Sequence, residues 1–337
     1  MKTFENRYSK RAEENSQFAR GLGIGLGKIF PFLGKEFQSK LFAQAQKNAE
    51  FAIGLGEGFG HVFIYLKKDL RNKILEDLGK QSNIENDETS GIQDIDNNYR
   101  RNGDGFSRGL GIGLGKNFPY IRKDLEFRIF AKAAANSQFA IGLGEGFGHI
   151  LSYVDNELQN IILQKSNERT LARGLGIGLG HVLYYFNDNE GLQNRIFREI
   201  ENNKVLAKSL GSCLNFSRLK HSNLLEKILA QAERNPEFTE GIRMNEDLRN
   251  DIKLLNKESQ GRITDVCNQL EEKGGYDKNK FSFNDYPITG FPSSTYYYCT
   301  NKKNEFDDQN VIDDEMKEYL QMVLDEMKNK NENDKNA

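Results

Sequence analysis

Cysteine is scarce in this sequence, and no signal segment opens it. The three cysteines, Cys213, Cys267 and Cys299, are scattered through 337 residues without a CxxC spacing. A sparse, odd number of cysteines argues against a disulfide framework or a cysteine-based zinc site and indicates a reducing compartment. Residues 1–20 are polar and contain no apolar run, which excludes a signal peptide. We therefore expect a cytoplasmic protein.

The sequence also lacks an excess of one charge and any long apolar segment. It has 47 Lys and Arg against 49 Asp and Glu, for a net charge of −2. Balanced charge argues against a general nucleic-acid binder. Arg20 and Lys28 enclose only seven residues, whereas a membrane helix needs about 20 apolar residues. We expect neither a specific nucleic-acid partner nor a membrane partner.

Glycine, by contrast, is abundant, and most of it lies in one recurring stretch. The first copy, residues 18–33, reads FARGLGIGLGKIFPFL. Further copies begin at Phe51, Phe106, Phe139 and Leu171, and a decayed copy begins at Leu206. The steps between copies are 33, 55, 33, 32 and 35 residues, so the second step contains one period plus an insertion. A period of this length is typical of stacked supersecondary units.

The hydrophobic period predicts that the recurring stretch is a helix. At about 100° per residue, one apolar stripe collects Phe18, Leu22, Leu26, Ile29 and Leu33. Small residues line both flanks of this stripe, with Gly23 and Gly27 on one side and Gly21 and Gly25 on the other. Each interior glycine weakens a helix by about 0.8–1 kcal/mol relative to alanine, so only tertiary packing can stabilise it. A glycine-rich strand is the less favoured alternative.

A second helix follows each glycine helix after a short turn, and in the first repeat it covers about residues 35–47. Pro31 and Pro119 predict that their glycine helices bend or end there. Asparagine recurs between hairpins, where it fits either a left-handed helix end or the next N-cap, at Asn15, Asn48, Asn136 and Asn235. The expected fold is therefore all-α, an α-solenoid of antiparallel helical hairpins with an irregular C-terminal tail.

The composition divides the chain into four parts. Residues 1–17 resemble half a repeat, and we interpret them as a cap or as the edge of a longer array. The solenoid is expected over 18–255, with a flexible Asn- and Asp-rich insertion at 79–105. Residues 256–310 are expected to be an irregular aromatic linker, although a helix could continue to about Glu272. Residues 311–337 suggest an amphipathic acidic helix followed by a disordered end, and this helix could fold back on the solenoid, pair with itself or dock a partner.

The positions opposite the apolar stripe form a polar row and are our candidate binding residues. They are Arg20, Ile24, Lys28, Glu57, His61, Arg108, Lys116, Glu145, His149, Arg173 and His181. We expect Arg20 and Lys28 to flank Glu57, and Arg108 and Lys116 to flank Glu145. The row is either a solvated face of mixed charge or a ligand surface. Stacked helices lie about 8–10 Å apart, too far for two of these histidines to share a metal, so we expect exposed histidines and no metal site.

No catalytic motif is recognisable. A phosphate-binding loop needs glycine, four residues and then Gly-Lys-Ser/Thr, but Leu22 and Ile29 occupy the first-glycine and hydroxyl positions around Lys28. The glycines recur in every repeat, whereas a dinucleotide fingerprint is a single strand–turn–helix element. Without a unique cluster of polar residues, we predict no catalytic residues, no cofactor and no enzymatic activity.

The segment FARGLGIGLGKIFPFL…AQAQKNAEFAIGLGEGFG resembles a class of glycine-rich helical-hairpin repeats of large microbial proteins. The resemblance covers about residues 12–238. Members of this class can follow signalling NTPase modules, so the resemblance implies a sensor or recognition array. The chain lacks a Walker motif, so a switching role would need a separate protein. The hairpins are more loosely similar to tetratricopeptide and HEAT arrays, which mostly bind proteins.

These observations favour a protein- or peptide-binding scaffold. A structural, self-assembling repeat protein is the main alternative, because an array that opens in mid-repeat would expose a helix face that another copy could cover. Binding of a nucleotide or another anion through the Gly/Arg/His face is a weaker alternative.

Overall fold

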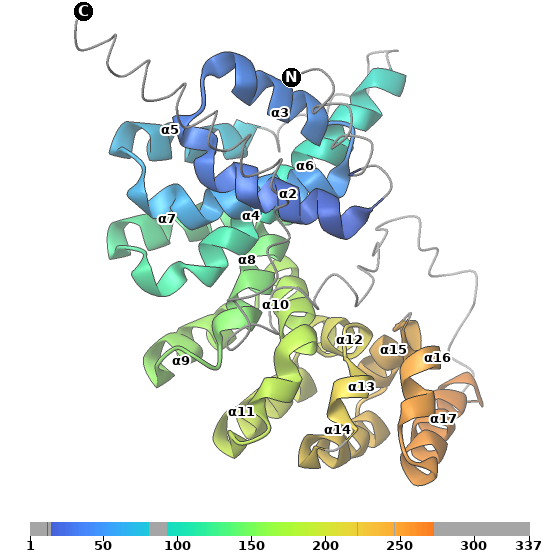
Figure 1. Ribbon diagram of the computed structural model, residues 1–337. Coiled ribbons are helices and arrows are strands. Elements are labelled where there is room, and N and C mark those ends of the chain that lie inside the picture. The colour runs from blue at the N-terminus through green and yellow to red at the C-terminus, as the bar shows by residue number, and fades with distance from the viewer. Residues whose placement is uncertain (1–11, 13–14, 81–92, 221, 246, 273–337) are drawn as a thin grey trace, which may run out of the picture.

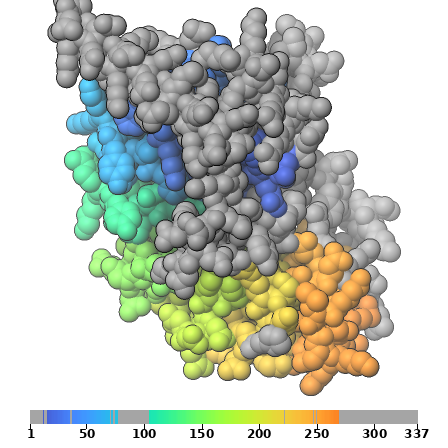
Figure 2. All heavy atoms as spheres, in the orientation of Figure 1, coloured from blue at the N-terminus to red at the C-terminus, as the bar shows by residue number. Residues whose placement is uncertain are grey.

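The computed structural model describes residues 12, 15–80, 93–220, 222–245 and 247–272. Every regular element in these ranges is helical, and the fold is an all-α solenoid of helical hairpins. Figure 1 shows the hairpins following one another in sequence order, from α2 (Ser16–Ile29) to α17 (Lys257–Glu272). The space-filling view shows the same progression over the visible surface, from blue through green to orange (Figure 2).

One helix of each hairpin belongs to a continuous inner row. After α2, this row consists of α4 (Ala49–Val62), α6 (Gln93–Lys116), α8 (Ser137–Ile150), α10 (Arg169–Val182), α12 (Lys204–Ser212) and α15 (Pro236–Met244). Each of these helices packs directly on the next. The row therefore connects all the described repeats.

The second helices of the hairpins form an outer layer. They are α3 (Lys35–Ala45), α5 (Lys68–Lys80), α7 (Lys123–Ala135), α9 (Asn156–Lys165), α11 (Glu190–Asn202), α14 (Asn223–Arg234) and α17. The short helices α13 (Phe216–Leu219) and α16 (Leu248–Asp251) belong to the last two units. The hydrophobic core lies between the two layers and includes completely buried phenylalanines such as Phe139 and Phe147. Burial of one such side chain stabilises the fold by about 1.5–3 kcal/mol.

Two glycine pairs on each of the first five inner helices determine how that part of the row packs. The leading pair contacts the preceding helix, and in α4, α6, α8 and α10 it is Gly54/Gly58, Gly109/Gly113, Gly142/Gly146 and Gly174/Gly178. The trailing pair contacts the following helix, and in α2, α4, α6, α8 and α10 it is Gly23/Gly27, Gly56/Gly60, Gly111/Gly115, Gly144/Gly148 and Gly176/Gly180. Leading and trailing pairs of adjacent helices face each other, so the two backbones are in direct contact.

A methyl group has no room at these glycines. A Cβ atom at Gly146 would lie 2.5 Å from the carbonyl oxygen of Ile112, and one at Gly115 would lie 2.5 Å from that of Leu143. The obstacle is backbone rather than a flexible side chain, so the helices would have to separate. The close approach explains why glycine is retained in helix interiors, where it otherwise weakens the helix.

The glycine pairs disappear toward the C-terminal end of the row. In α12, the leading positions are occupied by Ser209 and Cys213, whose Cβ atoms both lie close to glycines of α10. In α15, the position equivalent to the first trailing glycine is Arg243. The row therefore has no trailing glycine pair at its last described helix.

Asparagine residues cap the N-termini of the inner helices α4, α8, α12 and α15. The side chains of Asn48, Asn136, Asn203 and Asn235 accept the backbone N–H three residues ahead, at 2.9–3.0 Å. Three of these asparagines, Asn48, Asn203 and Asn235, also donate from Nδ2 to a backbone carbonyl about one repeat earlier in the chain, at Ala12, Ser166 and Ile200. The extended backbone of these residues identifies them as N-caps, rather than left-handed helix ends.

The helix boundaries confirm some sequence predictions and correct others. The glycine helices α2 and α6 end before Pro31 and Pro119 in 3₁₀ turns, as predicted. Residues 79–105 were predicted to be flexible, but 79–80 belong to α5 and 93–105 to α6, whereas 81–92 lie outside the described residues. Residues 257–272 form α17, which confirms the possible helix to Glu272 and shows that a linker starting at 256 was placed too early. The aromatic segment that follows, the C-terminal helix prediction and residues 1–11 also lie outside the described residues.

Candidate functional site

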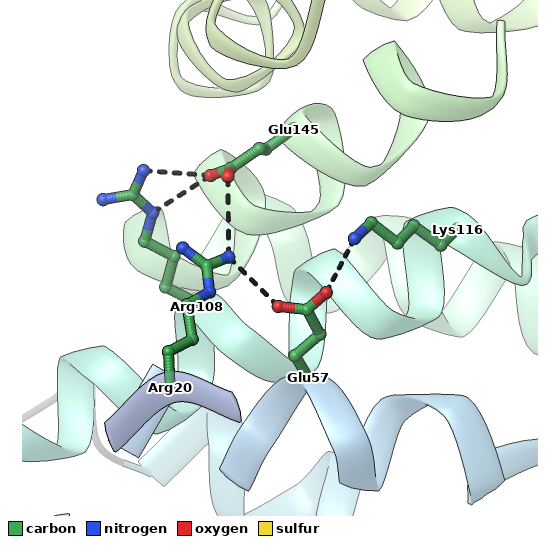
Figure 3. A network of polar contacts seen from close by, with 5 residues as sticks. All are labelled: Arg20, Glu57, Arg108, Lys116 and Glu145. Carbon is green, nitrogen blue, oxygen red and sulfur yellow. Dashed lines mark hydrogen bonds and ion pairs between the residues drawn. The ribbon is translucent and has the colours of Figure 1, made fainter. Parts of the chain in front are cut away.

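Five charged residues of the polar row meet at one place, although they come from four different helices. Arg20 lies on α2, Glu57 on α4, Arg108 and Lys116 on α6, and Glu145 on α8 (Figure 3). Each occupies the position opposite the apolar stripe of its helix. Close stacking of the glycine helices brings these positions within reach of one another. We call these five residues the charged cluster.

Two glutamates are the centres of the charged cluster. Arg20 Nη2 donates to Glu57 Oε2 at 3.0 Å, and Lys116 Nζ donates to Glu57 Oε1 at 2.6 Å. Arg108 donates to Glu145 Oε2 from Nη2 at 2.9 Å and from Nε at 3.3 Å. Arg20 also lies 4.0 Å from Glu145 Oε1 (Figure 3). Arg20 of the first described helix thus reaches the fourth helix of the row, so the row is curved around this face.

The two carboxylates are buried rather than solvated. Glu57 and Glu145 are each 2% exposed, and the arginines and the lysine that pair with them are only slightly more accessible. Burial alone would raise the pKa of Glu57, but Lys116 and Arg20 outweigh burial and hold this pKa well below its usual range. Burial likewise opposes ionisation of Glu145, but Arg108 and Arg20 lower its pKa. Both glutamates are therefore ionised at neutral pH.

Three histidines surround the charged cluster, and all three have a depressed pKa. Burial, reinforced by Lys116, lowers the pKa of His61 to about 4. Burial lowers the pKa of His181 to about 4 and that of His149 well below its ordinary value. The Nδ2 of Asn117 lies 2.6 Å from Nδ1 of His61. At neutral pH these histidines are uncharged and add no further positive charge to the cluster.

The structure corrects our expectation of a solvated polar row. Glu57 and Glu145 are buried, and the three histidines are not fully exposed, because the curved row encloses the face that a single-helix projection places outside. Lys116 pairs with Glu57 of the preceding helix, not with Glu145. Ile24 and Arg173 are half-buried, whereas Lys28 is exposed and has no ion pair among the described residues.

The charged cluster links neighbouring helices of the inner row. Its carboxylates form ion pairs with arginine and lysine side chains of neighbouring helices, so these cations have partners inside the chain.

Within the described ranges, no group of three or more histidine, cysteine or acidic side chains is placed to hold a metal ion. None of the described helices is long and apolar enough to cross a membrane.

A different row of side chains is exposed to solvent, and we did not single it out in the sequence. In each of the five glycine-rich repeats, one aromatic residue lies at the turn after the glycine helix: Phe32, Tyr65, Tyr120, Tyr153 and Tyr185. Their exposed fractions are 61%, 79%, 73%, 67% and 40%. Aligning the five copies residue by residue would have revealed this pattern, because the turns read FPF, FIY, FPY, LSY and LYYF. We call these five residues the aromatic row.

The outer helices hold the turns that carry the aromatic row. Gln38 donates to the carbonyl oxygen of Phe30, and Arg71 donates to that of Ile64. Gln159 and Gln193 likewise donate to the carbonyl oxygens of Leu151 and Phe186. These donors anchor four of the five turns, so the aromatic side chains project from fixed backbone.

The comparisons with known proteins leave the site to be interpreted from its geometry. No family model matches the chain, and searches of curated proteins and of solved structures found no match.

Proposed function

We propose that this chain is a non-catalytic scaffold that binds a protein or a peptide along the aromatic row. The observation that carries the proposal is the repeated exposure of an aromatic side chain at one position in five successive repeats. Single exposed aromatic residues are common on protein surfaces, whereas here one stays exposed at the same position of five repeats. Tyrosine and phenylalanine supply a large share of the energy at protein interfaces.

The charges beside the aromatic row would give a bound segment its direction. Exposed Lys67, Lys68 and Asp69 follow Tyr65, and exposed Arg122, Lys123 and Asp124 follow Tyr120, so each of these two turns has one more basic than acidic residue. After Tyr153 and Tyr185, the exposed charged residues are instead Asp155, Glu157, Asp188 and Glu190. A partner with an acidic end and a basic end would be attracted in one orientation, and charge complementarity mainly supports specificity and association rate.

The charged cluster supports the proposal indirectly. Its arginines and lysine already have partners within the chain, which makes the glycine-helix face a poor site for a nucleotide or another anion. This argues against the weaker alternative stated above.

A peptide-selection experiment tests the proposed function. A display library of random 16-residue peptides is selected against the immobilised full chain, and enriched peptides are measured by fluorescence polarisation. We expect the triple variant Tyr65→Ser, Tyr120→Ser, Tyr153→Ser to weaken binding at least tenfold, which corresponds to about 1.4 kcal/mol. Phe127→Ser is the matched control, because Phe127 is 79% exposed but lies on α7 outside the row. Failure to enrich any peptide, or equal binding by the triple variant and wild type, would contradict the proposal.

A further inference from the structure

One half of the aromatic row combines exposed aromatic rings with exposed lysines. Tyr65 and Tyr120 are 79% and 73% exposed, and lysines follow both of them. Arg122 in the second turn pairs with Asp124, so the lysines supply the excess positive charge. We call Tyr65 and Tyr120, with Lys67, Lys68 and Lys123, the basic half of the row. Such a surface suits an occupant that has an apolar stripe bordered by carboxylates.

The chain itself contains a segment with this chemistry, residues 311–327, which we call the acidic segment. It holds six acidic residues and one lysine, for a net charge of −5. Apolar residues at helical spacing form one stripe: Ile312, Met316, Tyr319, Val323 and Met327. At 3.6 residues per turn, Glu315 and Glu326 border this stripe. The segment lies outside the described residues, and its chemistry follows from the sequence.

The connection to the acidic segment is long enough for it to reach the basic half of its own chain. Residues 273–310 follow α17, and these 38 residues span at most about 125 Å when fully extended. Five steps of the inner row lead from α15 back to α4, or about 40–50 Å at the usual spacing of packed helices. The length of the connection therefore permits docking within one chain.

The other half of the aromatic row would repel the acidic segment. The exposed charged residues that follow Tyr153 and Tyr185 are acidic: Asp155, Glu157, Asp188 and Glu190. Like charges brought together at an interface cost free energy, whereas opposite charges favour the encounter. The charge distribution along the row therefore selects the basic half for this segment.

We propose that the acidic segment docks on the basic half of the row in its own chain, with its apolar stripe against Tyr65 and Tyr120 and its carboxylates beside the lysines. This inference rests on the proposed function, because it gives the same binding surface an internal competitor. A tether supplies an effective concentration on the order of a millimolar, so an intrinsic dissociation constant of about 100 µM would keep the segment docked about nine-tenths of the time. An outside partner would have to displace it.

Hydrogen exchange of the full chain, read by mass spectrometry of peptides, tests the docking without any outside ligand. We expect the amides of residues 311–327 to exchange about tenfold faster in the double variant Tyr65→Ser, Tyr120→Ser than in the wild type, because docking protects them. Phe127→Ser is the matched control, because Phe127 is also 79% exposed but lies on α7 outside the row. It should exchange like the wild type.

A charge exchange tests the pairing between the two surfaces. Lys67→Glu with Lys123→Glu should speed exchange of the acidic segment, because carboxylates would then face carboxylates. Adding Glu315→Lys and Glu326→Lys to the same chain should restore slow exchange. A general disturbance of the fold by the first two substitutions would not be repaired by the second two.

Three outcomes would overturn the proposal. The first is equal exchange of residues 311–327 in the wild type and the double tyrosine variant, and the second is a charge exchange that restores nothing. The third is protection that falls on dilution, which would place the segment on a second copy.

The proposed function can fail separately from the docking. If no peptide is enriched against the chain, slow exchange of the acidic segment in the wild type can still be observed. If peptides are enriched, release of the segment by Glu315→Lys with Glu326→Lys should tighten their binding about tenfold, because the open surface is no longer a minor state. Unchanged peptide affinity in that variant would contradict competition at the basic half.

Discussion

At the residue scale, the charged cluster shows why the loss of one buried carboxylate should destabilise the fold. Glu57 accepts hydrogen bonds from Arg20 on one side and Lys116 on the other, and all three come from different helices. An ion pair of this kind does not necessarily stabilise a fold relative to apolar packing. Removing one member, however, leaves buried charges without a partner, and that is costly.

We therefore expect Glu57→Gln to lower the free energy of unfolding by about 3–5 kcal/mol, as measured by chemical denaturation at pH 7. The matched control is Asp124→Asn, because Asp124 pairs with Arg122 on the surface at 2.8 Å. Exposed pairs contribute about 0–1 kcal/mol, so the control should change stability little. Equal, small effects of the two substitutions would show that Glu57 is not enclosed as the structure has it.

The histidines around the charged cluster predict a pH dependence. His61 and His181 have a pKa of about 4 in the folded chain, against about 6.5 in an unfolded chain. Between these values, the unfolded chain binds more protons, so the free energy of unfolding must fall as the pH is lowered from 6.5 toward 4. The glutamates act in the same direction at lower pH, because their folded-state pKa is depressed. Denaturation midpoints measured at half-unit pH steps should decrease as the pH is lowered through this window. His181→Gln should reduce the slope of stability against pH. A slope unchanged by His181→Gln would rule out a buried neutral His181.

At the scale of single elements, the asparagine caps join local helix formation to the contact between repeats. Asn235, at the end of α14, accepts the N–H of Phe238 and donates to the carbonyl oxygen of Ile200 on α11, the outer helix of the preceding hairpin. Asn15 is exposed, and among the described residues it makes only the first kind of bond, to Phe18. The two residues thus separate the contribution of the cap from that of the link between hairpins.

Asn235→Ala should cost more than Asn15→Ala. Loss of an N-cap costs typically about 1 kcal/mol, and the unsatisfied buried carbonyl of Ile200 adds about 1–3 kcal/mol. We expect a difference of at least about 1 kcal/mol between the two variants in chemical denaturation. Equal losses would mean that the bond from Asn235 to Ile200 adds no stability.

At the scale of the whole molecule, the repeat made the fold predictable from the sequence. The hydrophobic period identified the glycine helices, the prolines at 31 and 119 marked their ends, and the constant step indicated stacked hairpins. All of these signals are local, so they can be recognised without knowledge of the tertiary structure. The helical start of α6 was missed because the composition of residues 93–105 suggests a loop.

The environment of the polar row could not be predicted in the same way. A single-helix projection correctly placed Arg20 and Glu57 opposite the apolar stripe, but it contains no information on curvature. Only the three-dimensional row brings Arg20 of α2 to within 4.0 Å of Glu145 of α8. The aromatic row was recognised only from the exposed fractions of its side chains, although its period was present in the sequence.

The central claim is that glycine pairs stabilise this array only where two helices touch. One pair of substitutions tests it, because Gly25 and Gly113 occupy equivalent positions in α2 and α6. A Cβ atom at Gly113 would meet the carbonyl oxygen of Glu57 and lie 2.8 Å from Cα of Gly60, whereas one at Gly25 would meet nothing.

The free energy of unfolding should therefore change in opposite directions, when measured by chemical denaturation at a concentration low enough to keep the chain monomeric. We predict that Gly113→Ala lowers it by about 1–3 kcal/mol or more, through overpacking between two backbones. Gly25→Ala should raise it by up to about 1 kcal/mol, through better helix propensity. If both substitutions stabilise the chain, or both destabilise it equally, the helices are not held together by their glycine contacts, and the account is wrong.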